Sequence, residues 1–153
     1  MQTETVERIC LSNEVLKPDF AGCWAADQLP EPNEYPFAVV VNVDTSIKKG
    51  SHWTCIYSPQ PELVYFFCSL GRRPKGIVKR YLQSNFDQIW RNKCVFQKRC
   101  SNVCGHYAIY ALFYLCKGTK FERVLGRLHR SQNADQLVHK FIQKIERQSK
   151  TIR

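Results

Sequence analysis

The chain has 153 residues with a formal net charge of +10, and 44% of them are hydrophobic and 12% aromatic. This composition suits one packed domain over residues 1–153 and is atypical of a disordered protein. The longest apolar stretch has 10 residues, short of the roughly 18 that a membrane span needs.

The start of the chain lacks a basic segment followed by an apolar run, so no secretory signal is visible and we expect an intracellular protein. We also expect it to be a monomer. Its eight cysteines are then expected to be thiols, metal ligands or a nucleophile rather than disulfides. The charge is uneven, because residues 1–60 carry net −4 and residues 61–153 net +14. A basic half of this kind favours a polyanion partner, nucleic acid above all, although a solvated face that keeps the protein soluble explains it too.

In chain order, apolar spacing predicts a short helix over 3–16, and a turn-rich segment follows over 17–36. Short runs rich in β-branched and aromatic residues then predict three strands. The strands are expected at 37–43, 52–57 and 63–69, with turns at 48–51 and 58–61.

Beyond residue 71 the apolar residues recur at helical spacing. We expect a buried helix that follows the cap-type residues Ser101 and Asn102 and reaches Leu115. The other elements expected here are an amphipathic helix at 75–91 with a basic face, a short strand at 94–97, a charged helix at 120–129 and a last helix capped by Asn133. Strands that precede most of the helices indicate an α+β fold.

The most informative residue for chemistry is Cys104, at the expected start of the buried helix. Unpaired backbone N–H groups and the helix dipole favour the thiolate form of a cysteine placed there. A nucleophilic cysteine needs a base, and of the four histidines His52 begins a strand directly after a turn, where it can project into a cleft. His106 would point to a different helix face from Cys104, while His129 and His139 lie in charged helices. Simple packing of Cys104 in an apolar helix is the competing interpretation.

Five segments in order carry a resemblance to a known family: GCWAADQLP, a run ending in VNVD, GSHWTCIY, YFFCSLGRRP and FQKRCSNVCGHYAIYAL. Over residues 20–116 this series resembles the adenain-like cysteine proteases, which include the adenovirus maturation protease and relatives in Polinton/Maverick transposons and related DNA viruses. SUMO-specific proteases are more distant relatives. The resemblance implies an α+β fold in which a central, mostly antiparallel sheet packs against a buried central helix, with further helices around it.

The resemblance also implies roles for individual residues. His52 would be the general base, Cys104 the nucleophile, and Gln97 the side-chain donor to the oxyanion beside the Cys104 N–H. Trp53 matches a family tryptophan and would help to wall the substrate cleft, although it is equally an ordinary core indole. No cofactor or metal is implied.

One position departs from the family pattern. In YFFCSLG, Cys68 stands where the family has a carboxylate that orients the histidine. A neutral thiol is a poor acceptor and cannot stabilise an imidazolium as a carboxylate does. The chain is therefore a Cys–His dyad enzyme, an enzyme that uses another acceptor such as the Ser69 hydroxyl, or an inactive relative, and we favour retained activity. Asp44 matches an aspartate outside the triad and is interpreted as structural.

The resemblance leads us to expect an intracellular endopeptidase that cleaves structural precursor proteins of a DNA virus or virus-like transposon, acting in the host nucleus and the virion. Relatives favour small residues, especially Gly, beside the cut. Adenovirus proteases use DNA and a short viral peptide as activators, and the basic half suits DNA. Its relevant residues are Arg72, Arg73, Lys75, Lys79 and Arg80.

Three alternatives remain. The chain could be an inactive protease-fold module that binds DNA or protein, as Cys68 and the charge asymmetry suggest. It could be a deubiquitinase or SUMO-type isopeptidase with the same chemistry. A zinc site at Cys94, Cys100, Cys104 and His106 can be drawn, but the C-x2-C spacing typical of zinc ligands is absent.

Overall fold

A computed structural model describes residues 1–43 and 52–151 of the chain. Over these residues five strands form one sheet in the order β1-β2-β3-β4-β5. The strands are β1 (Phe20–Ala25), β2 (Phe37–Asn42), β3 (Trp53–Gln60), β4 (Leu63–Phe67) and β5 (Gln88–Arg91). The pairs β2–β3 and β3–β4 are antiparallel, whereas β1–β2 and β4–β5 are parallel. The centre of the sheet is thus antiparallel, as expected, and its two outer pairs are not.

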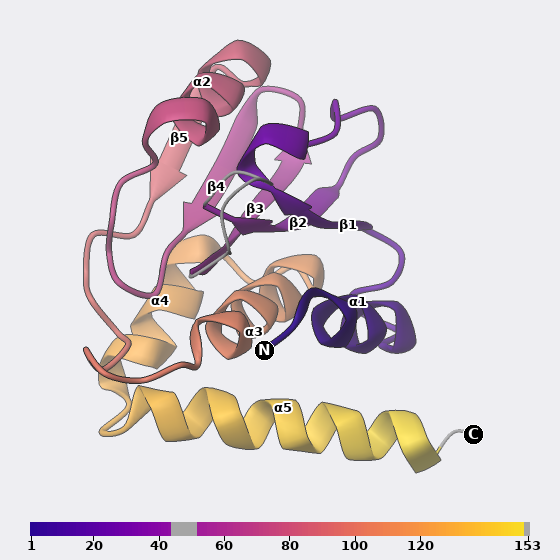
Figure 1. Cartoon of the computed structure of the whole chain (residues 1–153), viewed down its shortest axis with the longest axis vertical. Helices are drawn as coiled ribbons and strands as arrows, with labels where there is room; N and C mark the ends of the chain where they lie inside the picture. The colour runs from indigo at the N-terminus through magenta and orange to yellow at the C-terminus, as the bar shows by residue number, and fades with distance from the viewer. Residues whose placement is uncertain (44–51, 152–153) are drawn as a thin grey trace.

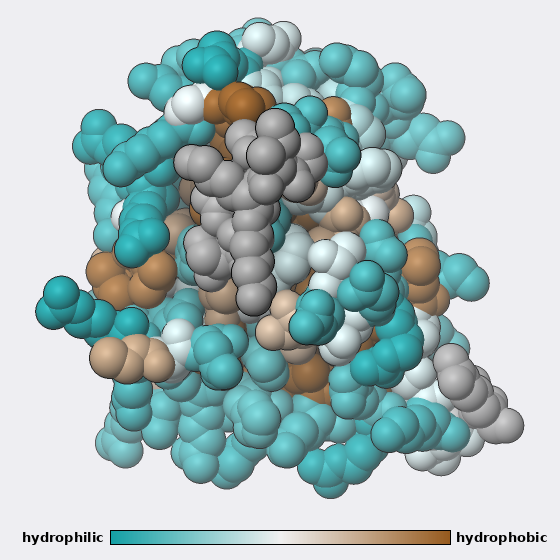
Figure 2. Space-filling model, viewed as in Figure 1, coloured by the Kyte–Doolittle hydropathy of each residue, from teal (hydrophilic) through white to brown (hydrophobic). Residues whose placement is uncertain are grey.

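Helices cover both faces of the sheet (Figure 1). One face carries α2 (Gly76–Asn85), and the other carries α3 (Cys104–Cys116), which packs on β3. Three further helices surround α3: α1 (Thr3–Ser12), α4 (Phe121–Arg130) and α5 (Ala134–Thr151). Figure 2 shows a mostly hydrophilic surface along the lower part of this view, where α5 lies. Among the described residues, no helix is both long and apolar enough to cross a bilayer.

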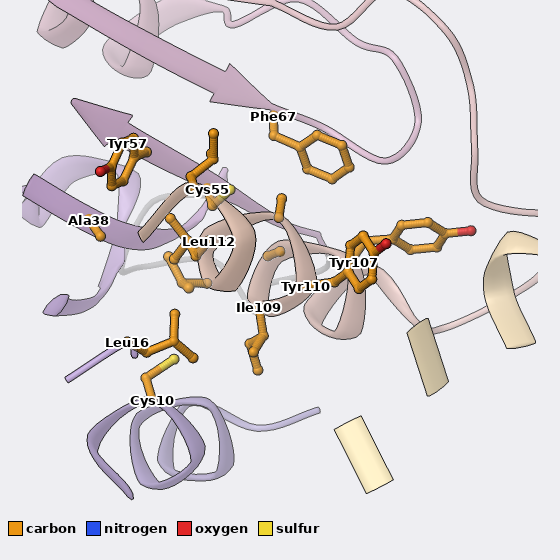
Figure 3. Close-up of a cluster of buried hydrophobic side chains, with 14 of the residues drawn as sticks. Cys10, Leu16, Ala38, Cys55, Tyr57, Phe67, Tyr107, Ile109, Tyr110 and Leu112 are labelled. Carbon is orange, nitrogen blue, oxygen red and sulfur yellow. The ribbon is translucent and has the colours of Figure 1, made fainter. Parts of the chain in front are cut away.

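Two hydrophobic clusters lie on opposite faces of the sheet. The larger one gathers side chains from α1, α3 and the facing sides of β2, β3 and β4, and Figure 3 shows Leu112 and Ile109 of α3 at its centre. The smaller one lies beneath α2 and contains Phe66, Val78 and Leu82. Because the strands alternate their side chains between these clusters, β2 is buried on both faces, which explains its continuous apolar run.

The structure corrects the expected elements in three places on the sheet. The turn-rich segment 17–36 contains β1, which pairs with β2 and was missed because FAGCWA is short and rich in small residues. The strand expected at 52–57 continues through Pro59 to Gln60, so the turn lies at residues 61–62 instead of 58–61. The run expected as a strand at 94–97 is irregular, because the N–H groups of Phe96 and Gln97 both donate to the Ser69 carbonyl.

Two expectations about helices are also wrong. The helix expected at 75–91 ends at Asn85, and residues 88–91 form edge strand β5, where Trp90 is exposed. The prediction was wrong because Ile89 and Trp90 keep the helical spacing of apolar residues in α2, although they belong to a strand that pairs with β4. The start of α3 is capped by neither Ser101 nor Asn102, since Val103 occupies the N-cap position without a side-chain hydrogen bond. By contrast, Asn133 does cap α5, accepting a hydrogen bond from the Gln136 N–H at 3.1 Å.

Candidate active site

The sheet and the central helix bring three segments of the expected site together. Cys55 of β3 pairs with Phe67 of β4, so the residue that precedes β3, His52, lies beside the residue that follows β4, Cys68. Packing of α3 on β3 places the first residue of α3, Cys104, against the start of the same strand. His52, Cys68 and Cys104 therefore converge although 52 positions separate the first from the last.

The side chains of His52 and Cys68 are in direct contact. The imidazole Nε2 lies 3.2 Å from the Cys68 Sγ, and both residues are buried. Burial raises the pKa of the Cys68 thiol, while the N–H groups of Arg72 and Leu70 and the Arg72 charge act in the opposite direction. The position where the family has a carboxylate thus holds a buried thiol surrounded by groups that would favour an anion.

Cys104 contacts the residue next to His52. The Trp53 backbone N–H donates to the Cys104 Sγ at 3.4 Å. No side chain caps the start of α3, so no cap acceptor competes for the backbone N–H groups of its first turn. The N-terminus of a helix favours an anion placed beside it, such as an oxygen that develops negative charge next to Cys104.

Gln97 is held by three hydrogen bonds. Its side-chain Oε1 accepts from the Ser69 Oγ at 2.6 Å, its Nε2 donates to the Ser101 carbonyl at 2.9 Å, and its backbone N–H donates to the Ser69 carbonyl at 3.0 Å. The amide is 5% exposed and has a fixed orientation. Because Nε2 carries two hydrogens, the bond to Ser101 leaves a second donor on the same nitrogen.

A residue that the sequence did not single out, Asn92, fixes the backbone at Cys68. Its Oδ1 accepts from the Cys68 N–H at 2.9 Å, and its Nδ2 donates to the carbonyls of Cys68 at 2.6 Å and Cys94 at 3.2 Å. Asn92 is 2% exposed, so these bonds are shielded from water. In the sequence it is one asparagine at a junction between elements, and no spacing or motif distinguishes it from a turn residue.

Trp53 is half-buried beside the Cys104 position. Its indole Nε1 donates to the Met1 carbonyl at 3.0 Å, and its ring and the Met1 side chain both lie within 3.4 Å of the place where a Cβ on Gly105 would stand. A glycine directly after Cys104 therefore lets two side chains approach the start of α3. Whether Trp53 also contacts substrate stays a prediction.

Among the described residues, no hydrogen bond joins any of the other histidines to Cys68 or Cys104. His106 faces α5, where its ring centroid is 5.5 Å from that of His139, and burial lowers its pKa to about 4. His129 and His139 are exposed. The alternative zinc set does not converge either: within residues 1–43 and 52–151 no group of three or more His, Cys, Asp or Glu side chains could hold a metal. Asp44 and the expected turn at 48–51 lie outside the described residues.

The protein is similar to known proteins in its structure, whereas sequence comparisons give no match. No protein-family model matches the sequence, and no curated protein matches it. The structure is similar to that of the African swine fever virus (ASFV) pS273R protease, with a TM-score of 0.66 and 15% identity over 92% of this chain and 65% of that one. A selenomethionine structure of the same protease gives a TM-score of 0.51 and 20% identity over 69% of this chain and 42% of that one.

A looser likeness is to the C-terminal Ulp1 protease domain in complex with the yeast orthologue of SUMO, with a TM-score of 0.47 and 13% identity over 90% of this chain and 76% of that domain. At such identities the likeness establishes the fold alone: the chain has the α+β fold of the pS273R protease. The chain spans 65% of the pS273R protease. The narrower likeness to the adenovirus protease stays a prediction.

Proposed function

We propose that this chain is a cysteine endopeptidase that cleaves structural precursor proteins of a DNA virus or virus-like transposon. The observation that carries the proposal is the meeting of the β3 start and the α3 start, where the Trp53 N–H contacts the Cys104 Sγ and His52 is the neighbouring residue. This meeting occurs in a fold shared with a viral protease. The viral likeness and the order of the five sequence segments support the choice of substrate.

In the proposed mechanism His52 acts through Nδ1, because Nε2 contacts Cys68. Nδ1 accepts the proton of the Cys104 thiol, and the thiolate attacks the carbonyl carbon of the scissile peptide bond. The resulting imidazolium gives its proton to the leaving amine as the C–N bond breaks. Water, deprotonated by the same imidazole, then hydrolyses the thioester and releases the thiol.

Gln97 and the start of α3 would stabilise the tetrahedral intermediate. The second hydrogen on Nε2 of Gln97 and the backbone N–H at Cys104 are the two donors proposed for the oxyanion. Ser69 positions the amide through the 2.6 Å bond to Oε1. Small residues, especially Gly, are proposed beside the cleaved bond, and the site of action would be the host nucleus and the virion.

The experiment that tests this function incubates the protein with a library of peptides derived from a proteome and identifies new chain ends by mass spectrometry. We expect cleavage by the wild type that disappears with Cys104→Ala and with His52→Ala. Lys140→Glu, an exposed change on α5, serves as the control that keeps cleavage. Cleavage that persists in Cys104→Ala would contradict the assignment of the nucleophile.

The isopeptidase alternative predicts a different substrate with the same chemistry. Purified SUMO and ubiquitin conjugates would be processed, and the peptide library would not. The inactive alternative predicts that neither is cut, even with DNA present.

DNA and a short peptide as activators stay predictions, and adding each one to the library assay tests them. The five basic residues proposed for DNA lie on the exposed segment before α2 and on α2 itself.

A further inference from the structure

We propose that a cationic cavity beside His52 binds an acidic side chain of the protein substrate, on the leaving-group side of the scissile bond. The inference rests on the proposed protease function and names the class of substrate that the same site would select. It concerns a cavity lined by His52 and Cys68 whose described lining does not include Cys104 and whose rim contains three of the basic residues that the sequence suggested for DNA.

The cavity has a volume of about 230 Å³. Its inner part contains His52, Cys68 and Phe66, all of which are buried, and its rim is formed by Arg72, Arg73 and Lys75, all of which are exposed. Pockets that hold a whole small-molecule ligand usually measure about 300–1,000 Å³. A smaller cavity with an open rim suits one side chain of a bound peptide.

The charge of the cavity selects an anion. Three cations form the rim, and no acidic residue is among the described residues that line it. Within the part of the chain that the structure describes, the single ion pair joins Arg8 to Glu146, so the three rim cations have no described carboxylate partner. They are therefore able to pair with a carboxylate that a ligand brings.

The apolar residues that line the cavity strengthen its preference for an anionic side chain. Val43, Phe66 and Val78 also line the cavity, and the latter two are buried, so they would keep water away from part of a bound side chain. A lower local dielectric increases the attraction between a carboxylate and the guanidinium groups. The same apolar walls suit the methylene groups of a glutamate, whereas a nucleic-acid phosphate has no apolar stem to place there. A single acidic side chain fits these features better than a nucleic-acid backbone.

The position of the cavity indicates that it binds the substrate segment that follows the cleaved bond, which is the leaving group. The thiol of Cys104 lies against the Trp53 N–H, and the contact with Cys68 lies on the Nε2 side of His52. In the proposed mechanism the imidazole protonates the leaving amine, so the peptide that follows the cleaved bond must pass over His52. Continuing beyond His52, that segment reaches the cavity, and the acidic residue is therefore expected within the first few residues after the cut.

The first test uses three matched peptide libraries cleaved by the wild type, identical except for Glu, Gln or Lys at the first three positions after a fixed Gly. We expect kcat/KM at least tenfold higher for Glu than for Gln at one of these positions, and lowest for Lys. The variants Arg73→Glu and Lys75→Glu should reverse the order, so that Lys becomes preferred. Lys140→Glu, which makes the same charge change on α5, should keep the preference for Glu. Equal rates for Glu and Gln, or a preference that survives both rim variants, would overturn the proposal.

The second test needs no catalysis, so it separates this inference from the proposed function. In the Cys104→Ala protein we expect N-acetylglutamate amide, titrated by NMR, to shift the Val78 methyl and His52 ring signals, and the uncharged glutamine analogue to shift neither. Arg73→Glu should remove the response. If no peptide is cleaved but glutamate binds, the protease proposal fails and the anion site stands. If glutamate gives no shift while a short DNA duplex shifts the same signals, the cavity is a nucleic-acid contact and the inference is wrong.

Discussion

The Cys68 Sγ lies 3.2 Å from Nε2 of the His52 ring, and both side chains are buried. A thiol in this place can orient the ring, because the contact exists and Asn92 fixes the Cys68 backbone. It offers little electrostatic stabilisation of an imidazolium while it stays protonated, and burial raises its pKa. The enzyme we propose is therefore oriented for catalysis but has a weaker base than a carboxylate would give.

Replacing the thiol with a carboxylate, Cys68→Asp, should raise kcat/KM about tenfold. A hydrogen bond to a charged acceptor is worth about 1.4 kcal/mol more than one to a neutral acceptor, which corresponds to that factor in rate. The N–H groups of Leu70 and Arg72 already point at the side-chain position and would offset the cost of burying the charge. Steady-state cleavage of the best library peptide measures the gain.

Cys68→Ala provides the matched comparison for that experiment. It removes the ring contact without adding charge, so activity should fall below that of the wild type. Urea unfolding of both variants separates loss of folding from loss of catalysis. A folded Cys68→Asp protein with no gain in rate would show that another group orients His52.

The eight cysteines should differ sharply in their rates of alkylation. At pH 6 an ordinary thiol, with a pKa near 8.5, is almost wholly protonated. As the nucleophile of the proposed pair with His52, Cys104 should nevertheless react with iodoacetamide about ten times faster than the exposed Cys94 and Cys100. Mass spectrometry of tryptic peptides after timed labelling measures each rate.

Four of the five remaining thiols act as internal controls for this labelling. Burial raises the pKa of Cys10, Cys23, Cys55 and Cys116, so they should stay unlabelled in the folded protein. His52→Ala should slow Cys104 to the rate of the exposed thiols and leave Cys94 and Cys100 unchanged. If Cys104 reacts no faster than Cys94, even with DNA added, the inactive interpretation is the better one.

Gln97 and Ser69 should affect turnover without affecting the thiolate. Removing one oxyanion donor, Gln97→Ala, is expected to lower kcat by about 10²–10³-fold. Ser69→Ala deletes the 2.6 Å bond to Oε1 but leaves the amide in place, so a smaller loss of about tenfold is expected. Alkylation of Cys104 at pH 6 should be the same in both variants as in the wild type. A parallel fall in alkylation and turnover would mean that Gln97 supports the thiol and not the oxyanion.

Local sequence patterns correctly predicted the elements in which a single pattern, such as a continuous β-branched run or a long apolar run, extends over the whole element. The β-branched run FAVVVN predicted β2, and the apolar residues after Cys104 predicted α3. Short elements whose pairing partner is distant in sequence were missed. β1 and β5 become strands because β2 and β4 offer free edges, and Ile89 and Trp90 of β5 happen to continue the helical spacing of α2. The local sequence of β1 or β5 does not show that β2 and β4 have unpaired edges.

The site was predicted from a resemblance and from chemistry, and its supporting contacts were not. The motifs located His52, Cys68 and Cys104, and the structure brings the first two into contact and the third beside Trp53. Their catalytic roles stay predictions. The Asn92 bonds to Cys68 and the cavity beside His52 depend on how β5 and the start of α2 fold back on β4, so no spacing within the sequence could indicate them.

Asn92 should be important for stability. Asn92→Ala leaves the N–H and carbonyl of Cys68 without their side-chain partner in a buried place, which is expected to cost about 2–4 kcal/mol in the free energy of unfolding. Asn92→Asp should also destabilise at neutral pH, because a carboxylate would face the Cys68 carbonyl, and stability should recover as the pH falls and the carboxyl group is protonated. Urea unfolding at pH 7 and pH 5 measures both changes. Asn33→Ala, at an exposed position, is the control, and a loss below about 0.5 kcal/mol for Asn92→Ala would refute the proposed clamp.

His106 should make the fold sensitive to acid. Burial lowers its pKa from 6.5 to about 4, the charge of His139 on α5 acts in the same direction, and Glu146 on α5 opposes them. Between these two values the unfolded chain binds a proton at this position and the folded chain does not, so stability should fall as the pH drops from about 6.5 to about 4. The midpoint of urea unfolding, measured at half-unit steps from pH 7.5 to 4, should therefore decrease across this window.

Substitution of the histidine distinguishes its own effect from general acid unfolding. In His106→Gln the fall in the unfolding midpoint between pH 6.5 and 4 should be smaller than in the wild type, since the side chain no longer gains a proton on unfolding. His129→Gln, on the exposed end of α4, should keep the wild-type slope. Because the His139 ring lies against the His106 ring and its charge lowers the His106 pKa, His139→Gln should raise the folded-state pKa of His106. The fall should then still begin near pH 6.5, but it should end at a higher pH and be smaller in total than in the wild type. Equal slopes in the wild type and His106→Gln would show that the charge of His106 is tolerated in the folded state and that other groups set the acid limit.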